Sequence, residues 1–530
     1  MNALASDRGR REVLVCGALA IALSFLWIWP QAANLRQVPD RGDPVFSAWR
    51  LARVAHQLRT DPAHLYEGNI FYPRGWTLAY SDATLLQGVL AAPLLWAGMA
   101  PLVAANLMLV LAFPLGALAF FYSAWRLTGS PLAALVAGAL GAWYPFRAQH
   151  VSHLELQWFM FAPLAIVAAL ETVADPNWRR GCTVGVLVVL QSFASMYYGL
   201  MLATALVPIV AIAAWQHRRV LAPRRLAAAA AAMICVVTPF AILLSIPYAR
   251  ARADHGERPQ GEVELGSARG SDYVKTSRRS TTYRWNPRAG NMPERELFPG
   301  VTTWVLAGAG LTPAAAPLIG GGLATFDWSL GQHGLTYRWL TAAIGPYRSI
   351  RVPARFAALL GTILVLLSAF GAQRIIGSRT RPAQLALTAL LLAAIAWDSR
   401  LTLDLVDYDP APPAFYATLG PKDVVAALPG GREIDYMYFS TRGWNRMLRG
   451  YSGFIPIDDA MEAAVAAFPG SSSVELLRSY GATHLTYICA FERSAPRCAH
   501  TLDVLGARSD LELVADDVWH GAAARLYRFK

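Results

Sequence analysis

Long apolar runs recur along most of this chain and constrain its fold more than any other feature. They begin at Val13 and end at Trp397. A helix needs about 20 mostly apolar residues to cross the hydrocarbon core of a bilayer, because each residue adds only 1.5 Å. Hydrophobic residues make up 55% of the chain and charged residues 15%, whereas soluble domains average about 45–50% and 25%. The sequence therefore predicts an integral membrane protein with many spans.

The apolar runs define a membrane domain of residues 1–402, for which we predict about 10–12 transmembrane helices. The runs lie at 13–29, 83–98, 101–125, 131–146, 156–174, 181–196, 199–215, 226–247, 300–329, 356–373 and 384–397. Two of them leave the count open. The run 83–98 is short enough to lie along the membrane, and 300–329 is broken at Thr312-Pro313.

Short basic loops predict the orientation of these spans, because Lys and Arg concentrate in cytoplasmic loops. The pairs Arg179-Arg180 and Arg218-Arg219 mark two such loops. This assignment places the N-terminus in the cytoplasm and the charged stretches 31–82 and 248–298 outside, as two large outer loops. The first of these loops contains a candidate amphipathic helix over 44–58.

Residues 403–530 have ordinary soluble patterning and are predicted to form a small extracytoplasmic α/β or α+β domain. We expect helices at 423–428 and 472–479, and strands at 483–487 and 522–528. Cys489 and Cys498 lie close together in this region. They form either a disulfide, if the domain faces an oxidising compartment, or two buried thiols.

Several function classes are disfavoured by the sequence. It contains no Walker loop, no GxSxG and no HExxH motif, and the glycines at 320–322 lack a following Lys-Ser/Thr pair. The formal net charge is +12, but the arginines are scattered through short loops rather than gathered in a patch with aromatic residues. We therefore expect a lipid bilayer, and no nucleic acid, as the partner of this charge.

Two groups of polar residues near the predicted outer face are candidates for chemistry. Asp43 precedes Pro44 at the start of the outer-loop helix, where its carboxylate caps the helix, acts as a general base, or does both. His150, His153 and Glu155 lie between two apolar runs. They bind a divalent metal, if the chain bends at Ser152, or hydrogen-bond a substrate, or simply provide interface polarity.

A third group consists of arginines at predicted outer helix ends. These are Arg74, Arg250, Arg252, Arg351 and Arg355. A guanidinium binds phosphate through two parallel hydrogen bonds. The same side chains also extend toward lipid headgroups from helix ends, so each one has both interpretations.

Six short segments resemble the GT-C superfamily of membrane glycosyltransferases, in an uncharacterised bacterial branch. They are 42–49 (GDPVFSAW), 69–73 (NIFYP), 144–157 (YPFRAQHVSHLELQ), 296–300 (ELFPG), 351–356 (RVPARF) and 451–454 (YSGF). The resemblance spans nearly the whole chain. It implies a GT-C-like fold and transfer of a sugar from a polyprenyl-phosphate carrier to a glycan, lipid or protein acceptor at the outer face of the bacterial inner membrane.

The resemblance also implies roles for individual residues. Asp43 would deprotonate the acceptor hydroxyl, with Glu155, His153 or Glu67 as further catalytic groups. The donor phosphate would be held by Arg74, Arg147, Arg351 and Arg355. GT-C enzymes often carry a paired acidic motif in the first outer loop, whereas this loop offers Asp43 beside Pro44. No cofactor is required by this interpretation, and a divalent metal remains an alternative.

Two other functions stay open at this stage. One is a transporter or flippase of lipid-linked glycans, which would have inverted repeats and ionisable residues at mid-membrane. The other is a non-catalytic envelope assembly protein that binds a partner through its outer domain.

Overall fold

The structure of the chain is a computed structural model that describes residues 7–286, 292–408, 411–456 and 458–530. It divides into two compact units. The membrane unit comprises Met1–Pro39, Asn106–Ser245 and Gly256–Leu405, and the outer unit comprises Asp40–Ala105, Ile246–His255 and Val406–Lys530. The C-terminal region is thus grouped with the first predicted outer loop. A domain boundary at 402/403 stays a prediction.

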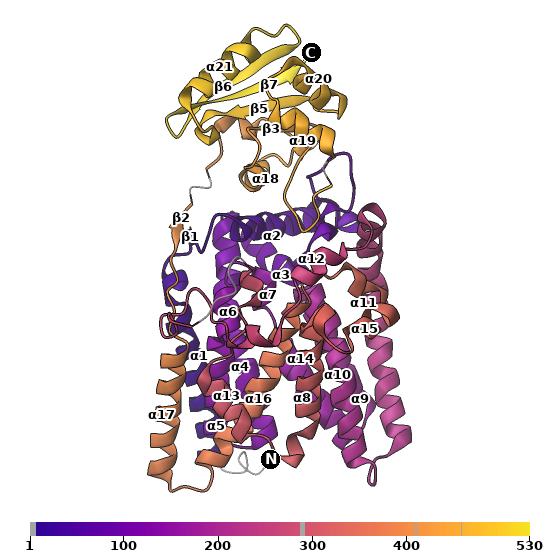
Figure 1. Cartoon of the computed structure of the whole chain (residues 1–530), viewed down its shortest axis with the longest axis vertical. Coiled ribbons are helices and arrows are strands. Elements are labelled where there is room, and N and C mark those ends of the chain that lie inside the picture. The colour runs from indigo at the N-terminus through magenta and orange to yellow at the C-terminus, as the bar shows by residue number, and fades with distance from the viewer. Residues whose placement is uncertain (1–6, 287–291, 409–410, 457) are drawn as a thin grey trace. The chain divides into compact units, whose positions relative to one another are not determined.

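The membrane unit is built mostly from long helices, many of which lie side by side (Figure 1). Its main helices are α1 (Asp7–Ala33), α4 (Pro101–Thr128), α5 (Pro131–Trp143), α6 (Pro145–Gln149), α7 (Leu154–Gln157), α8 (Phe161–Ala174), α9 (Trp178–Ala194), α10 (Met196–His217), α11 (Pro223–His255), α12 (Gln260–Leu265), α13 (Val301–Ala309), α14 (Ala316–Ser329), α15 (Tyr337–Ala343), α16 (Ala357–Ile376) and α17 (Arg381–Asp398). Short 3₁₀ turns connect them, including η4 (Gly270–Val274), η5 (Pro293–Arg295) and η9 (Pro353–Phe356), and β1 (Gln37–Val38) follows α1.

Six helical segments in the described part of the chain are long and apolar enough to cross a membrane, or seven if one bent pair counts as a span. The chain is therefore a multi-pass membrane protein. The number is lower than the 10–12 predicted, because several apolar runs form short helices. The run 83–98 becomes the 12-residue helix α3 (Leu85–Trp96), and 300–329 becomes α13 and α14, which meet at an angle of 111°.

Burial distinguishes the central helix of the membrane unit from those at its surface. The apolar stretch that contains α16 is 89% buried, whereas that of α11 is 11% buried and that of α1 is 28% buried. Apolar side chains exposed on α11 match hydrocarbon rather than water. Helix α11 also continues to His255, so the second outer loop begins at residue 256 rather than at 248. Residues 287–291 of that loop lie outside the described residues.

The outer unit combines α2 from the first outer loop and the short apolar helix that follows it with a five-stranded sheet. Its elements are α2 (Asp43–Thr60), η2 (Pro62–His64), η3 (Thr77–Tyr80), α3, β2 (Val406–Asp407), η10 (Ala414–Ala417), β3 (Val424–Leu428), α18 (Glu433–Ser440), β4 (Arg446–Met447), α19 (Asp459–Ala466), α20 (Ser471–Ser479), β5 (His484–Ile488), η11 (Cys489–Phe491), α21 (Ala495–Gly506), β6 (Leu511–Trp519) and β7 (Ala522–Phe529). The predicted helix 44–58 is therefore present as α2. It is buried nearly all round rather than along one face, because α3 and α18 both pack against it.

The sheet has the strand order β4-β3-β5-β7-β6 and forms the core of the C-terminal region (Figure 1). Strands β4 and β5 run parallel to β3, and β7 is antiparallel to both β5 and β6. The predicted strands 483–487 and 522–528 and the predicted helix 472–479 are confirmed as β5, β7 and α20. The predicted helix 423–428 is wrong, because this segment is the buried strand β3. A short apolar run between prolines is typical of a buried parallel strand.

Candidate functional site

The break between α6 and α7 presents the polar segment that the sequence singled out. Pro145 begins the short helix α6, His150 follows its last residue, and His153 precedes α7. The side chain of Gln157 donates to the backbone oxygen of His150 (2.7 Å) and holds this turn in place. Because the chain bends here, His150 and His153 come within 6.0 Å of each other, measured between ring centroids.

A charged cluster forms where this turn meets two other segments of the membrane unit. Glu294 comes from η5 and Arg355 from η9. The Arg355 guanidinium donates through Nη2 to Glu294 Oε1 (2.6 Å) and through Nε to Glu294 Oε2 (3.3 Å). His150 Nδ1 lies 3.7 Å and His153 Nε2 lies 4.0 Å from the same carboxylate. We call these four residues, with the buried Glu155, the charged cluster.

Burial and neighbouring charges shift the pKa values of His150 and Glu294, which lie outside the membrane-spanning segments. Burial lowers the pKa of His150 to about 3, and the field of Glu294 opposes this only in part. His150 is therefore neutral at pH 7. Burial would raise the pKa of Glu294, but the ion pair with Arg355 outweighs burial and holds that pKa well below its usual range. The cluster thus combines an ionised carboxylate, a guanidinium and a neutral imidazole.

A neighbouring ion pair fixes the segment that carries Glu294. The buried Asp272 accepts from Arg295 Nε (2.7 Å) and from Lys275 Nζ (2.5 Å). Arg295 is adjacent to Glu294, so this contact orients η5. Glu294 was missed by the sequence interpretation, although it lies two residues before the quoted segment 296–300. It and Arg355 are 61 residues apart, and only the tertiary fold brings them together.

The described residues contain no group of three or more His, Cys, Asp or Glu side chains arranged to hold a metal ion. The Glu294 carboxylate lies 3.7 Å from a ring nitrogen of His150 and 4.0 Å from one of His153. Glu294 is also already paired with Arg355.

The three membrane-unit arginines predicted to bind phosphate differ in their surroundings. Arg355 belongs to the charged cluster, and Arg351 is exposed four residues before it. Arg147 is 0% exposed. It donates to the backbone oxygens of Ala112 (3.0 Å) and Gly141 (3.3 Å) and to Gln157 (3.2 Å). Arg147 therefore joins α4 to the end of α5 and offers no surface to a phosphate in this conformation.

Asp43 lies at the N-terminal end of α2 in the outer unit. Gly42 occupies the N-cap position, and Asp43 is the first helical residue. An acidic side chain in the first turn favours the start of a helix. The Asp43 carboxylate accepts from Tyr451 Oη (3.3 Å), in the segment 451–454 that also carried the resemblance. Tyr451 in turn packs edge-on against Phe46 at 5.3 Å.

Glu67 is held apart from Asp43 within the outer unit. Its backbone oxygen accepts from Arg53 Nε (2.7 Å), and its carboxylate accepts from the backbone N–H of Trp76 (3.0 Å). Arg53 is ten residues along α2 from Asp43, which corresponds to roughly 15 Å of helix. The two acids do not form a pair, and Glu67 instead stabilises the turn before η3. Arg74, in that turn, is exposed.

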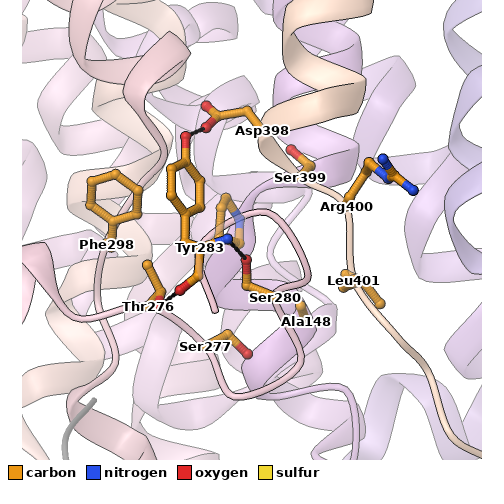
Figure 2. Close-up of a pocket in the computed structure, with 11 residues that line it drawn as sticks. Ala148, Thr276, Ser277, Ser280, Tyr283, Phe298, Asp398, Ser399, Arg400 and Leu401 are labelled. Carbon is orange, nitrogen blue, oxygen red and sulfur yellow. Dashed lines mark hydrogen bonds between the residues drawn. The ribbon is translucent and has the colours of Figure 1, made fainter. Parts of the chain in front are cut away.

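A small cavity in the membrane unit lies beside α6 (Figure 2). Asp398, at the end of α17, accepts from Tyr283 Oη and from the backbone N–H groups of Val301 (3.2 Å) and Thr302 (2.8 Å). It thereby caps the N-terminus of α13. The cavity measures about 20 Å³, which is room for one water molecule. It is too small for a sugar.

Comparisons with known proteins identify the fold. No protein-family model matches the chain, and a search of curated protein sequences found no match. Among solved structures, the arabinofuranosyltransferase AftD from Mycobacteria matches 98% of this chain at 16% identity, with a TM-score of 0.59. A mutant of AftD gives 15% identity and a TM-score of 0.61. This chain spans 40–41% of the length of AftD.

ArnT from Cupriavidus metallidurans is similar over its whole length. The match covers 97% of each chain at 12% identity, with a TM-score of 0.50. The chain therefore shares the fold of AftD and ArnT, which is the fold that the sequence resemblance implied.

Proposed function

We propose that this chain is a membrane glycosyltransferase that moves a sugar from a polyprenyl-phosphate carrier to a glycan, lipid or protein acceptor. The observation that carries the proposal is the GT-C fold, matched along 97–98% of the chain in AftD and ArnT. AftD is by name an arabinofuranosyltransferase, so arabinofuranose is the first sugar to test. The proposed location is the bacterial inner membrane, with transfer on the extracytoplasmic side.

Asp43 is the proposed general base. An acidic residue in the first outer loop is what the GT-C resemblance implies, and α2 holds this one rigidly because the helix is buried nearly all round. The carboxylate is partly exposed and is oriented by Tyr451. In the reaction, the acceptor oxygen forms a bond to the anomeric carbon as the bond from that carbon to phosphate breaks. The acceptor proton goes to Asp43, and the bonding electrons leave with polyprenyl phosphate.

The charged cluster and Arg351 are the proposed ligands of the leaving phosphate. Arg355 already binds the Glu294 carboxylate with both arms of its guanidinium, which is the geometry that a phosphate also uses. His150 Nε2 is buried and has no hydrogen-bond partner among the described residues. Glu155 and His153 lie in the same cluster, and we propose that they orient the donor sugar.

The disulfide supports an oxidising compartment for the C-terminal region. Cys489 and Cys498 are joined by a disulfide, which is the first of the two alternatives that the sequence left open. Disulfides persist in the periplasm and outside the cell and are rare in the cytosol. Residues 403–530 are therefore proposed to be extracytoplasmic, as the basic loops of the membrane unit predict.

The proposal is tested with purified protein in liposomes and a panel of short-chain polyprenyl-phosphate sugars, beginning with arabinofuranose. Asp43→Asn is expected to abolish sugar transfer while the protein stays inserted and elutes as the wild type does. Asp61→Asn is the matched control, since Asp61 follows α2 and is half exposed beside His64. Full transfer by Asp43→Asn would refute the proposed base. Flipping of labelled lipid-linked sugar without any transfer would favour a flippase.

A further inference from the structure

A second cavity opens at one end of the membrane unit, where α13, α16 and α17 meet. It measures about 690 Å³ and is lined by Arg374, Arg379 and five apolar residues. None of the candidate catalytic residues lies in it. The end of the helices that carries these arginines is the one predicted to face the cytoplasm.

Close helix packing explains why this space exists. A Cβ at Gly310 would lie 2.0 Å from the backbone oxygen of Leu367, and one at Gly371 would lie 2.0 Å from that of Leu306. The backbones of α13 and α16 are therefore in direct contact. Helix α13 then ends at Ala309, while α16 continues to Ile376. Arg374, in the last turn of α16, lines the cavity together with Ala309 at the end of α13.

Both arginines lack an anionic partner in the part of the chain that the structure describes. Arg374 and Arg379 are exposed, and neither has an ion pair or a side-chain hydrogen bond to a described residue. Arg381 is different, because it pairs with Glu12 at 2.9 Å. Two uncompensated guanidinium groups that line one cavity attract an anion and fit a phosphate.

The start of α17 adds to this positive potential. This 18-residue helix has Thr380 at its N-cap without a side-chain capping bond, and Ala383 in its first turn lines the cavity. The first N–H groups of a helix point away from its body and favour a negative group. The N-terminus of α17 therefore adds to the positive potential that Arg374 and Arg379 create at the cavity.

The apolar part of the lining indicates which phosphate is bound. Five of the seven lining residues are Ala, Ile or Leu. On α17 the apolar surface continues one turn past the cavity, where Leu390 is on the same helix face and is 64% exposed. An inorganic phosphate gains nothing from such a surface, whereas an acyl chain does. Anionic lipids are also enriched in the cytoplasmic leaflet, which the loop charges predict for this end.

We propose that this cavity is a binding site for an anionic phospholipid. Arg374 and Arg379 bind the phosphate of the headgroup, and one acyl chain lies along Leu387 and the exposed Leu390 of α17. The site is separate from the proposed sugar transfer and does not depend on it.

The test measures binding of phosphatidylglycerol to the purified full chain in nanodiscs of phosphatidylcholine, by native mass spectrometry. Each basic residue near a lipid surface contributes about 1 kcal/mol, so Arg374→Gln with Arg379→Gln is expected to weaken binding roughly thirty-fold. Arg224→Gln with Arg225→Gln removes the same charge from exposed positions at the start of α11. It should leave binding unchanged. Equal loss in the two double variants would show that only net charge matters and would overturn the proposal.

Two further arms separate the site from its alternatives. Ala386→Trp fills the cavity without changing charge, and it is expected to reduce phosphatidylglycerol binding at least ten-fold. Unchanged binding in this variant would overturn the proposal, even if the arginine variant fails to fold. Millimolar inorganic phosphate should not displace the lipid. If it competes fully, the ligand is a free anion and the lipid assignment is wrong.

Discussion

Replacing Glu294 by glutamine removes the negative charge of the carboxylate that accepts two hydrogen bonds from the Arg355 guanidinium. The side chains of Glu294 and Arg355 are 21% and 10% exposed, so the pair is largely withdrawn from water. Removing one partner of a buried pair leaves an uncompensated charge, and such changes destabilise proteins by about 3–5 kcal/mol. Because Glu294 retains some exposure, we expect a loss near the lower end, roughly 3 kcal/mol in the free energy of unfolding.

A double-mutant cycle separates this pair from general damage to the loop. The free energy of unfolding is measured in mixed micelles by titration with a denaturing detergent, followed by tryptophan fluorescence. Arg355→Gln alone should also destabilise, but the double variant should recover part of the loss, with a coupling energy of about 1–3 kcal/mol. The exposed pair Glu257 and Arg348, at 49% and 44% exposure, provides a control with an expected coupling below about 1 kcal/mol. Additive losses at Glu294 and Arg355 would refute the assignment of this pair as the centre of the cluster.

The remaining predictions concern other parts of the chain. Acidification from pH 7 to pH 5 should destabilise the protein, because the pKa of about 3 for buried His150 lies below its value of about 6.5 in an unfolded chain. As the pH falls, the unfolded state therefore binds a proton at His150 before the folded state does. This lowers the free energy of unfolding by up to about 1.4 kcal/mol per pH unit below pH 6.5. The His150→Gln variant should lack this dependence on pH in the same titration. Arg147→Gln should lower the free energy of unfolding by at least about 3 kcal/mol, since it leaves several buried carbonyls without a donor. Arg351→Gln should change the free energy of unfolding by less than about 0.5 kcal/mol and should instead slow turnover of the sugar donor. Under denaturing, non-reducing conditions three of the five cysteines should react with a thiol reagent, and Cys489→Ser with Cys498→Ser should lower stability by roughly 2–3 kcal/mol.

The membrane spans were predictable because their signal is local. Each long apolar run is a property of about 20 consecutive residues, and the helices α4, α8, α10 and α16 follow the predicted runs closely. The segment 423–428 was misread because a five-residue apolar run has no periodicity that separates a strand from a helix. Its neighbours β4 and β5 decide the matter, and both come from elsewhere in the sequence.

The candidate site was only partly predictable, because its partners are distant in the sequence. Asp43 was singled out, but its hydrogen bond to Tyr451 joins residues 408 positions apart. The apolar residues of 44–58 on or near one face suggested an amphipathic helix, whereas α3 and α18 both pack against α2 and most of its residues are buried. The 18 residues of α2 carry no information about these two helices, so the burial of α2 could not be predicted from its own sequence pattern.

Arg147 and Arg355 show what distinguishes a structural guanidinium from one that can bind a ligand. Both were predicted to hold phosphate, and both are buried. Arg147 donates to neutral carbonyl and amide oxygens of the fold, and breaking these bonds would leave buried acceptors unsatisfied on several segments. Arg355 instead holds a carboxylate, whose charge and two-oxygen geometry a phosphate reproduces. A phosphate diester carries the same single negative charge as a carboxylate, so it can accept from the Arg355 guanidinium in place of Glu294. A sequence reports that an arginine stands at a helix end, but whether its partner is exchangeable depends on a residue 61 positions away.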